Sequence, residues 1–274
     1  TRQYAKAGAN VVALLDTSRL GDQIRALPKL ASRPAMLMKG LGLVAGLTFS
    51  GVAIHRGITP VEIHGDDDHD AVALGYHLRP EFQLADLAGC RFSFDAQTRQ
   101  FWPDIDASGR SSVEGVYLCG DGARTQGADG AELSGRLAAH AALSDAGHGT
   151  DSAASRSWQD QYRVMERFRQ GIADAYPWPY QQAAQLSDDT ILCRCESITV
   201  GEVRAVATQK GADELNRAKA FSRVGMGRCQ GRYCGHAAAE VVAAVTGLEL
   251  EAIGRLRGQA PVKPFAIATR KSPS

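Results

Sequence analysis

The sequence has no strong excess of charge of either sign and no long uninterrupted apolar run. Its 31 lysines and arginines nearly balance its 30 aspartates and glutamates, which argues against a protein that binds nucleic acid through bulk charge. The most apolar stretch, residues 35–54, is interrupted by Lys39 and by glycine and hydroxyl residues. It therefore predicts a buried helix or helix pair rather than a membrane span.

The start of the chain lacks an initiator methionine, a signal peptide and a basic targeting leader, so we expect a cytoplasmic protein. Residues 1–7 predict the end of a helix that Gly8 caps, and residues 11–15 predict a buried strand that ends at Asp16. The sequence is thus expected to begin in the middle of an αβ unit. We expect that an N-terminal part is missing from this sequence.

The hydrophobic patterning divides the chain into four predicted segments. Residues 1–150 alternate short apolar strands with helices, which is typical of an α/β domain. Residues 151–189 predict a helical connector, and residues 190–250 predict a small helical domain. Residues 251–274 contain several prolines and predict an extended tail.

Local signals predict the finer elements of the first two segments. Strands at 61–64 and 71–74 flank the acidic turn Gly65–Asp70, which is more typical of a solvated turn than of a cation site. Apolar residues recur at three- and four-residue steps over residues 158–172 and predict a helix with one packed face. The prolines that follow Tyr176 predict the end of this helix.

The small domain shows a clear helix start. Thr199 and Glu202 form a capping-box pattern, which predicts a helix that runs to about Lys210. Two further helices are predicted at residues 213–220 and 235–245. Three short helices in about 60 residues predict a compact unit of its own.

Four of the six cysteines lie in the last third of the chain, in two pairs. Cys193 and Cys195 are two residues apart, so on an extended segment their side chains point to the same side. Cys229 and Cys234 lie in a glycine-rich stretch whose backbone can wrap closely around an inorganic centre. These four thiols are the predicted ligands of a [2Fe–2S] cluster. Three alternatives stay open. Structural zinc is one, although a one-residue gap between two ligands is unusual for zinc. The others are disulfides and four unrelated buried thiols.

The charges around these cysteines agree with a cluster. Four thiolates and two sulfides outweigh two ferric ions, and the resulting negative charge calls for basic neighbours. Three arginines lie beside the predicted ligands: Arg194, Arg228 and Arg232. Cys234 falls at the start of a predicted helix, whose dipole favours a thiolate. Cys90 and Cys119 have no partner motif, and Cys119 is predicted to be a small buried residue at the end of an apolar strand.

A second motif lies in the first segment, between a predicted strand at 116–119 and a predicted helix at 129–143. A carboxylate at the end of a parallel strand can accept hydrogen bonds from a polyol, and glycines let a ligand approach the backbone. The N-terminus of the helix can direct N–H groups at a carbonyl that gains charge on reduction. The pattern predicts a flavin site, although an ordinary loop-to-helix turn is the alternative. Its residues are Gly120, Asp121, Gly122, Gly127 and Ala128.

With these motifs in place, the sequence resembles a known family. Residues 70–142 resemble the end of the FAD domain of two-dinucleotide-binding-domain flavoproteins of the glutathione-reductase type. Residues 191–244 resemble the small helical BFD-like [2Fe–2S] domain. In this order, the two resemble the A (α) subunits of opine oxidase, D-hydroxyproline dehydrogenase, dye-linked proline dehydrogenase and hydrogen cyanide synthase. The resemblance is based on the sequence motifs at residues 73–80, 115–122, 193–196 and 225–234.

The resemblance implies an electron-transfer flavoprotein subunit with FAD and [2Fe–2S], and with FMN at a subunit interface. It implies a flavin-containing B (β) subunit that oxidises an amino acid or opine, a small third subunit, and a peripheral link to the inner membrane through a quinone or respiratory acceptor. It implies no general base or nucleophile in this chain. Three histidines are expected to be structural: His77, His140 and His236.

Two features depart from the family pattern. The glycine motif that grips the FAD pyrophosphate is absent, and the second cysteine pair is spaced C-x₄-C where the ferredoxin-like prototype has C-x₂-C. Two alternative functions stay open. One is an NAD(P)H-dependent flavin and iron–sulfur reductase, and the other is a non-catalytic Cys₄ module, with zinc or a cluster, that docks a partner.

Overall fold

A computed structural model describes residues 2–61, 72, 75 and 78–262. The chain forms two compact units, each built from several stretches of sequence. The first unit contains residues 1–80, 95–98 and 105–179, and the second contains residues 81–94, 99–104 and 180 onward. His77, the predicted acidic turn and nearly all of the two strands predicted beside it lie outside the described residues.

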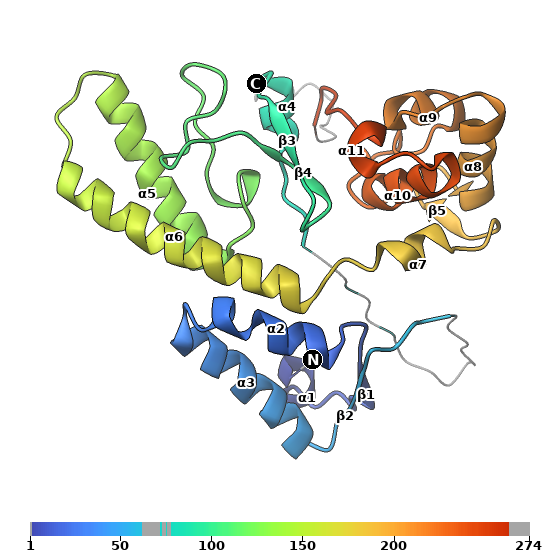
Figure 1. The fold of residues 1–274 in the computed structure, drawn as a ribbon, viewed down its shortest axis with the longest axis horizontal. Helices are drawn as coiled ribbons and strands as arrows, with labels where there is room; N and C mark the ends of the chain where they lie inside the picture. Colours follow the sequence, from blue (N-terminus) through green and yellow to red (C-terminus); the bar gives the residue numbers. More distant parts are fainter. Residues whose placement is uncertain (1, 62–71, 73–74, 76–77, 263–274) are drawn as a thin grey trace, which may run out of the picture. The chain divides into compact units, whose positions relative to one another are not determined.

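The first unit begins with a parallel strand pair. After the short helix α1 (Arg2–Lys6), strand β1 (Ala13–Asp16) pairs with β2 (Ala53–Arg56), and helices α2 (Leu20–Leu30) and α3 (Pro34–Phe49) connect them (Figure 1). A crossover of this kind is what parallel strands require. The predicted helix at the chain start and the strand that ends at Asp16 are therefore confirmed.

The predicted burial of these elements is wrong. Within the described residues Val12 is 76% exposed and Leu15 60% exposed, and Leu47 is the one fully buried side chain of α3. The reason is that a two-stranded sheet offers too little surface to cover an apolar strand and a helix that is apolar on all sides. None of the helices in the described residues combines the length and apolar character that a bilayer crossing requires.

Two long helices complete the first unit. Helix α6 (Ser152–Ala175) packs against α2 and against α5 (Gly127–Asp145), as Figure 1 shows for the yellow and green helices. The Asp151 carboxylate accepts hydrogen bonds from two N–H groups of the first turn of α6 and so caps it. The helix ends one residue before Tyr176, so the predicted connector helix and its proline-bounded end are confirmed.

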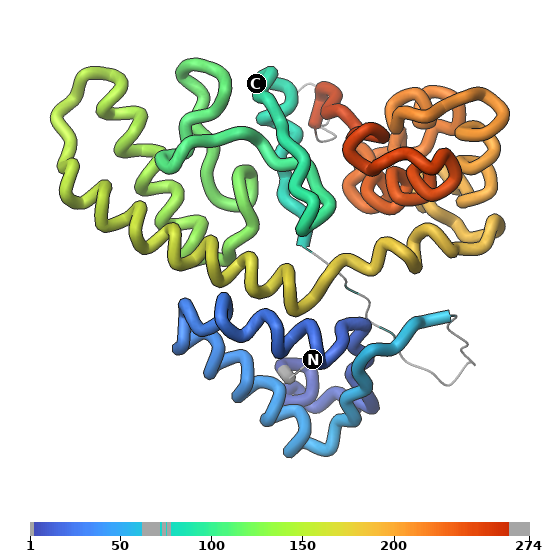
Figure 2. Tube along the Cα trace, viewed as in Figure 1, coloured from blue at the N-terminus to red at the C-terminus, as the bar shows by residue number. Residues whose placement is uncertain are grey.

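The second unit is mostly helical, and the orange and red part of the tube in Figure 2 shows its helical segments packed closely together. Thr199 and Glu202 form the predicted capping box, with hydrogen bonds of 3.2 and 2.7 Å. The three predicted helices are confirmed, and the short α7 and α11 are added to them. The elements are α7 (Tyr180–Ala184), β5 (Ile191–Cys193), β6 (Ile198–Thr199), α8 (Val200–Gln209), α9 (Leu215–Ser222), α10 (Gly235–Thr246) and α11 (Leu250–Ile253).

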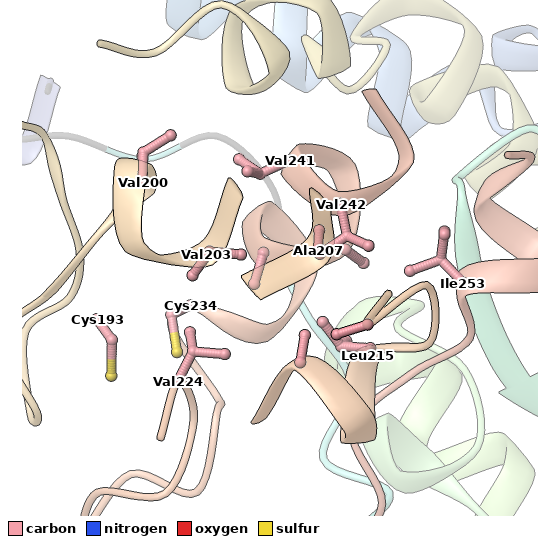
Figure 3. Close-up of a cluster of buried hydrophobic side chains, with 14 of the residues drawn as sticks. Cys193, Val200, Val203, Ala207, Leu215, Val224, Cys234, Val241, Val242 and Ile253 are labelled. Carbon is pink, nitrogen blue, oxygen red and sulfur yellow. The ribbon is translucent and has the colours of Figure 1, made fainter. Parts of the chain in front are cut away.

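The core of this unit consists of small and medium-sized apolar side chains. Val200 and Val203 of α8 are fully buried with Val241 and Val242 of α10, as Figure 3 shows. Leu215 of α9 belongs to the same buried cluster. A core of branched side chains without a fully buried large aromatic ring allows the helices to approach one another closely.

Residues from the first half of the sequence also belong to this unit. They include helix α4 (Gln83–Leu87), residues 92–94 of β3 (Phe92–Asp95), and β4 (Gln100–Pro103), which pairs with β3. Just before β4, Arg99 donates two hydrogen bonds, of 2.8 and 2.6 Å, to the carboxylate of Glu240, which is only 3% exposed. The predicted division of the chain into residues 1–150, 151–189, 190–250 and 251–274 stays a prediction.

Asp86 ties helix α4 to the end of the described chain. Its carboxylate accepts a hydrogen bond of 2.7 Å from Arg255 and another from the N–H of Gly258. Burial raises the pKa of Asp86, but these hydrogen bonds and the positive charges of Arg255 and Arg257 outweigh it, so the pKa lies below its usual 3.8.

This shift predicts how the stability of the second unit depends on pH. A lowered carboxyl pKa stabilises the folded state fully above pH 3.8, and this contribution is lost as the pH falls through the lower folded-state value. We expect Asp86→Asn to lower the free energy of unfolding by about 2 kcal/mol at pH 7, and the difference from the wild type to shrink as the pH falls below 3.8. Urea unfolding at several pH values measures this. Asp188→Asn, which weakens an exposed ion pair with Arg204 in the same unit, should cost about 0.5 kcal/mol or less.

Candidate metal centre and flavin site

The first cysteine pair lies at the end of a strand and in the turn that follows. Cys193 is the last residue of β5 and is buried, whereas Cys195 lies in the turn before β6 and is exposed. The prediction that both side chains share one face of a strand is therefore wrong. The strand ends too early, and Ser197, with φ of 56°, completes a tight turn there.

The second pair lies in the loop of residues 225–234, which we call the cysteine loop. Gly225 and Gly231 adopt φ of 78° and 73°, so the loop uses the conformational freedom of glycine as predicted. Cys229 is half-buried, and Cys234 is the buried N-cap residue of α10.

The structure brings the four thiols together in two pairs. Cys234 and Cys193 share a side-chain hydrogen bond, and Figure 3 shows them side by side at the edge of the valine core. Cys229 and Cys195 share a second one. The charge of Cys229 also acts on Cys234, so the pairs are neighbours. In the described part of the chain, no three His, Cys, Asp or Glu side chains converge as the ligands of a single metal ion.

The two pairs differ in their electrostatics. Burial, with the nearby Cys193 and Cys229, raises the pKa of Cys234 to about 12. In the protein without metal, desolvation thus outweighs the helix dipole at Cys234, and the thiolate ligand of a cluster at this helix terminus stays a prediction. Burial also raises the pKa of Cys229. However, N–H groups of Tyr233, Gly231 and Arg232 and the Cys195 thiol donate hydrogen bonds to its sulfur, and the net pKa is lowered.

The three arginines near the ligands are not equivalent. Arg232 is ion-paired with Glu81, whereas Arg194 and Arg228 are exposed and form no ion pair within the described residues. The sequence could not reveal the Glu81 contact, because 151 residues separate the partners. A second unpredicted residue is Gly227: a Cβ atom there would lie 2.2 Å from the Cβ of Cys195, so only glycine allows the two pairs to meet.

The predicted flavin residues surround a turn and a helix start. Gly120, Asp121 and Gly122 form one turn of 3₁₀ helix, and α5 starts at Gly127, which has φ of 77°. The helix is confirmed, but the described residues 116–119 form no parallel strand that leads into the turn. In its place Tyr117 forms a single antiparallel bridge with Arg110, and Cys119 is exposed rather than buried.

Polar groups accompany this helix start. The N–H of Gly120 donates to the Ser134 hydroxyl of α5 at 2.8 Å, which fixes the turn on the helix. Asp121, Gly127 and Ala128 are exposed. Burial lowers the pKa of Arg124, which follows the turn and donates to the carbonyl of Ala123. The predicted structural role of His140 agrees with its 2.9 Å hydrogen bond to the Asp151 carbonyl.

Comparison with known proteins adds independent support to this description. A family model described as "BFD-like [2Fe-2S] binding domain" matches residues 191–244. The A subunit of opine oxidase from Agrobacterium tumefaciens (strain Ach5) is 34% identical over 289 residues, which covers 97% of this chain and 57% of that protein. Hydrogen cyanide synthase subunit HcnB of Pseudomonas aeruginosa is 27% identical over 295 residues, covering 97% of this chain and 62% of HcnB.

The chain is therefore similar over nearly its whole length to HcnB and to the opine oxidase A subunit. It spans 62% and 57% of the length of these two proteins, respectively. A crystal structure of L-proline dehydrogenase from P. horikoshii matches with a TM-score of 0.61 and 20% identity, over 82% of this chain and 46% of that one. This likeness concerns the fold, so the chain is an α/β protein with a BFD-like domain in its C-terminal region.

The thiol pairing predicts the disulfides that form when the metal-free protein is oxidised. With a mild oxidant such as diamide, Cys195 should link to Cys229 first, because this pair is the more exposed and Cys229 has the lowered pKa. Peptide mapping by mass spectrometry identifies the linkage. Cys119 is exposed without a thiol partner among the described residues and should stay unlinked. A dominant Cys193–Cys195 or Cys229–Cys234 linkage would contradict the described geometry.

Proposed function

We propose that this chain is the electron-transferring A subunit of a multi-subunit dehydrogenase of amino acids, opines or related amines, with FAD and [2Fe–2S] as its redox groups. The observation that carries the proposal is the pairing of Cys193 with Cys234 and of Cys195 with Cys229 inside the BFD-like segment. Four further components complete the proposal: FMN at a subunit interface, a respiratory acceptor at the inner membrane, a small third chain and a flavin-containing B subunit.

The described residues fit a [2Fe–2S] cluster. Such a cluster takes two thiolates on each iron, and two neighbouring thiol pairs supply this donor set. When bound, the cluster takes up and releases one electron at a time. The chain itself would exclude water from Cys193 and Cys234 through the valine core. It would also direct the N–H groups of Gly231 and Tyr233 at the Cys229 sulfur.

The cluster assignment predicts a colour that one substitution removes. The purified protein should absorb broadly in the visible range and give a rhombic EPR signal after reduction. Cys195→Ser should lose most of both signals, because one iron loses a thiolate. Cys119→Ser removes an equally exposed thiol outside the site and should keep both signals. A colourless zinc protein, or an unchanged spectrum in Cys195→Ser, would overturn the assignment.

The flavin part of the proposal depends on Gly120, Asp121, Gly122, Gly127 and Ala128. The exposed Asp121 carboxylate can accept hydrogen bonds from ribityl hydroxyls, and the exposed start of α5 can direct N–H groups at the flavin ring. When bound, FAD accepts two electrons and passes them on singly. The glutathione-reductase-type arrangement of this domain belongs to the same proposal.

An acid extract of the purified protein tests the flavin. It should contain FAD, and Asp121→Ala should weaken FAD binding by about tenfold, because a charged acceptor is lost. Asp160→Ala, on the exposed side of α6, should leave the FAD content unchanged. An extract without FAD would contradict this part of the proposal. Bleaching of the flavin by NADH would favour the reductase alternative.

A further inference from the structure

The cysteine loop rests on a leucine that lies outside the segment matched by the BFD-like family. A Cβ atom at Gly225 would lie 2.4 Å from Cδ1 of Leu256, and a Cβ atom at Gly231 would lie 2.3 Å from the same atom. Leu256 thus fills the space that side chains would take at two turns of the loop. It is also packed against the hydrophobic core of the second unit.

A second set of contacts joins the loop to residues 81 and 83, which lie far from it in the sequence. The Glu81 carboxylate accepts a hydrogen bond and ion pair from Arg232, between the two cysteines of the loop. The Gln83 side-chain amide donates to the carbonyl of Gln230 at 3.1 Å. Arg232 also donates to the carbonyl of Cys229 at 3.1 Å, so Glu81 acts directly on a residue that holds the loop shape.

The two contacts belong to one substructure. Asp86 binds Arg255 and the N–H of Gly258, and the Arg255 guanidinium lies 3.8 Å above the ring of Phe92. Residues 81–94 and 255–262 are thereby joined, and we call them the collar. All of the collar lies outside residues 191–244.

We propose that the collar positions the cysteine loop for its redox group, with Leu256 and Glu81 as the positioning residues. The inference rests on the proposed function for the identity of that group. Leu256 fixes the spacing of the loop by packing, so that Cys229 and Cys234 are held ready before any metal binds. Glu81 holds Arg232 in place and cancels its positive charge beside the thiolates.

Packing by Leu256 is tested with two substitutions at that position. Leu256→Ala should lose iron to a chelator about tenfold faster than the wild type, because a supporting contact of the ligands is removed. Leu256→Met keeps the volume and should restore retention to near the wild-type rate. Leu248→Ala, at a partly exposed leucine after α10, is the matched control. Circular dichroism of each variant checks that the helices are retained.

The charge of Glu81 is tested by the midpoint potential of the cluster. Glu81→Gln leaves the Arg232 charge uncancelled, which favours the reduced and more negative cluster, so the midpoint potential should shift upward. Asp104→Asn removes a carboxylate that is paired with the exposed Arg91 and should leave the potential unchanged. Unchanged potential in Glu81→Gln, together with unchanged iron retention in Leu256→Ala, would overturn the proposal.

The metal-free protein separates a failure of the collar from a failure of the proposed function. If the wild type carries no [2Fe–2S] spectrum, the proposed function fails, but the collar is still tested by the rate of Cys195–Cys229 disulfide formation. That rate should fall several-fold in Leu256→Ala and recover in Leu256→Met, because the loop no longer holds Cys229 opposite Cys195. Equal rates in the three proteins would overturn the collar on its own.

Discussion

The second unit depends on the burial of two thiols against a core of branched side chains. Cys193 ends β5 and Cys234 starts α10, and both pack with Val224 and the valines of α8 and α10. Neutral thiols are readily buried in such a core, whereas two thiolates there would need a balancing cation. The packing that stabilises the metal-free fold is therefore also the packing that a bound cation would complement.

The rest of the site follows from this contact. Once β5 and α10 are joined through the buried pair, the turn after Cys193 places Cys195 opposite the cysteine loop, and the absence of a side chain at Gly227 allows the close approach. The N–H groups of the loop then point at Cys229. Long-range packing thus arranges the first pair, whereas short-range backbone geometry arranges the second.

The predictability of the fold differs between local and long-range features. The capping box at Thr199 and the helices around it could be predicted, because caps and periodicity act over a few residues. The exposure of Leu15 could not be predicted, since it depends on how much of the strand is covered by other parts of the fold. The antiparallel bridge between Tyr117 and Arg110 could not be predicted either, because an apolar run in the sequence does not specify the residue with which it pairs.

The site shows the same division. The four cysteines could be selected from their spacing and their glycine-rich surroundings, and the structure brings them together in two pairs. Which thiol meets which could not be predicted, because the strand ends at Cys193 and not beyond Cys195. The contact between Glu81 and Arg232 joins residues far apart in the sequence, and no pattern at either position indicates the other.

The unequal exposure of the two pairs has a consequence for electron placement. Cys193 and Cys234 face a dry core, whereas Cys195 is exposed and Tyr233, in the same loop as Cys229, is 86% exposed. Water stabilises added negative charge far better than a valine core does. A two-iron centre held by these pairs would therefore be solvated unequally, and added negative charge would be better stabilised on the side of Cys195 and Cys229 than on the side of Cys193 and Cys234.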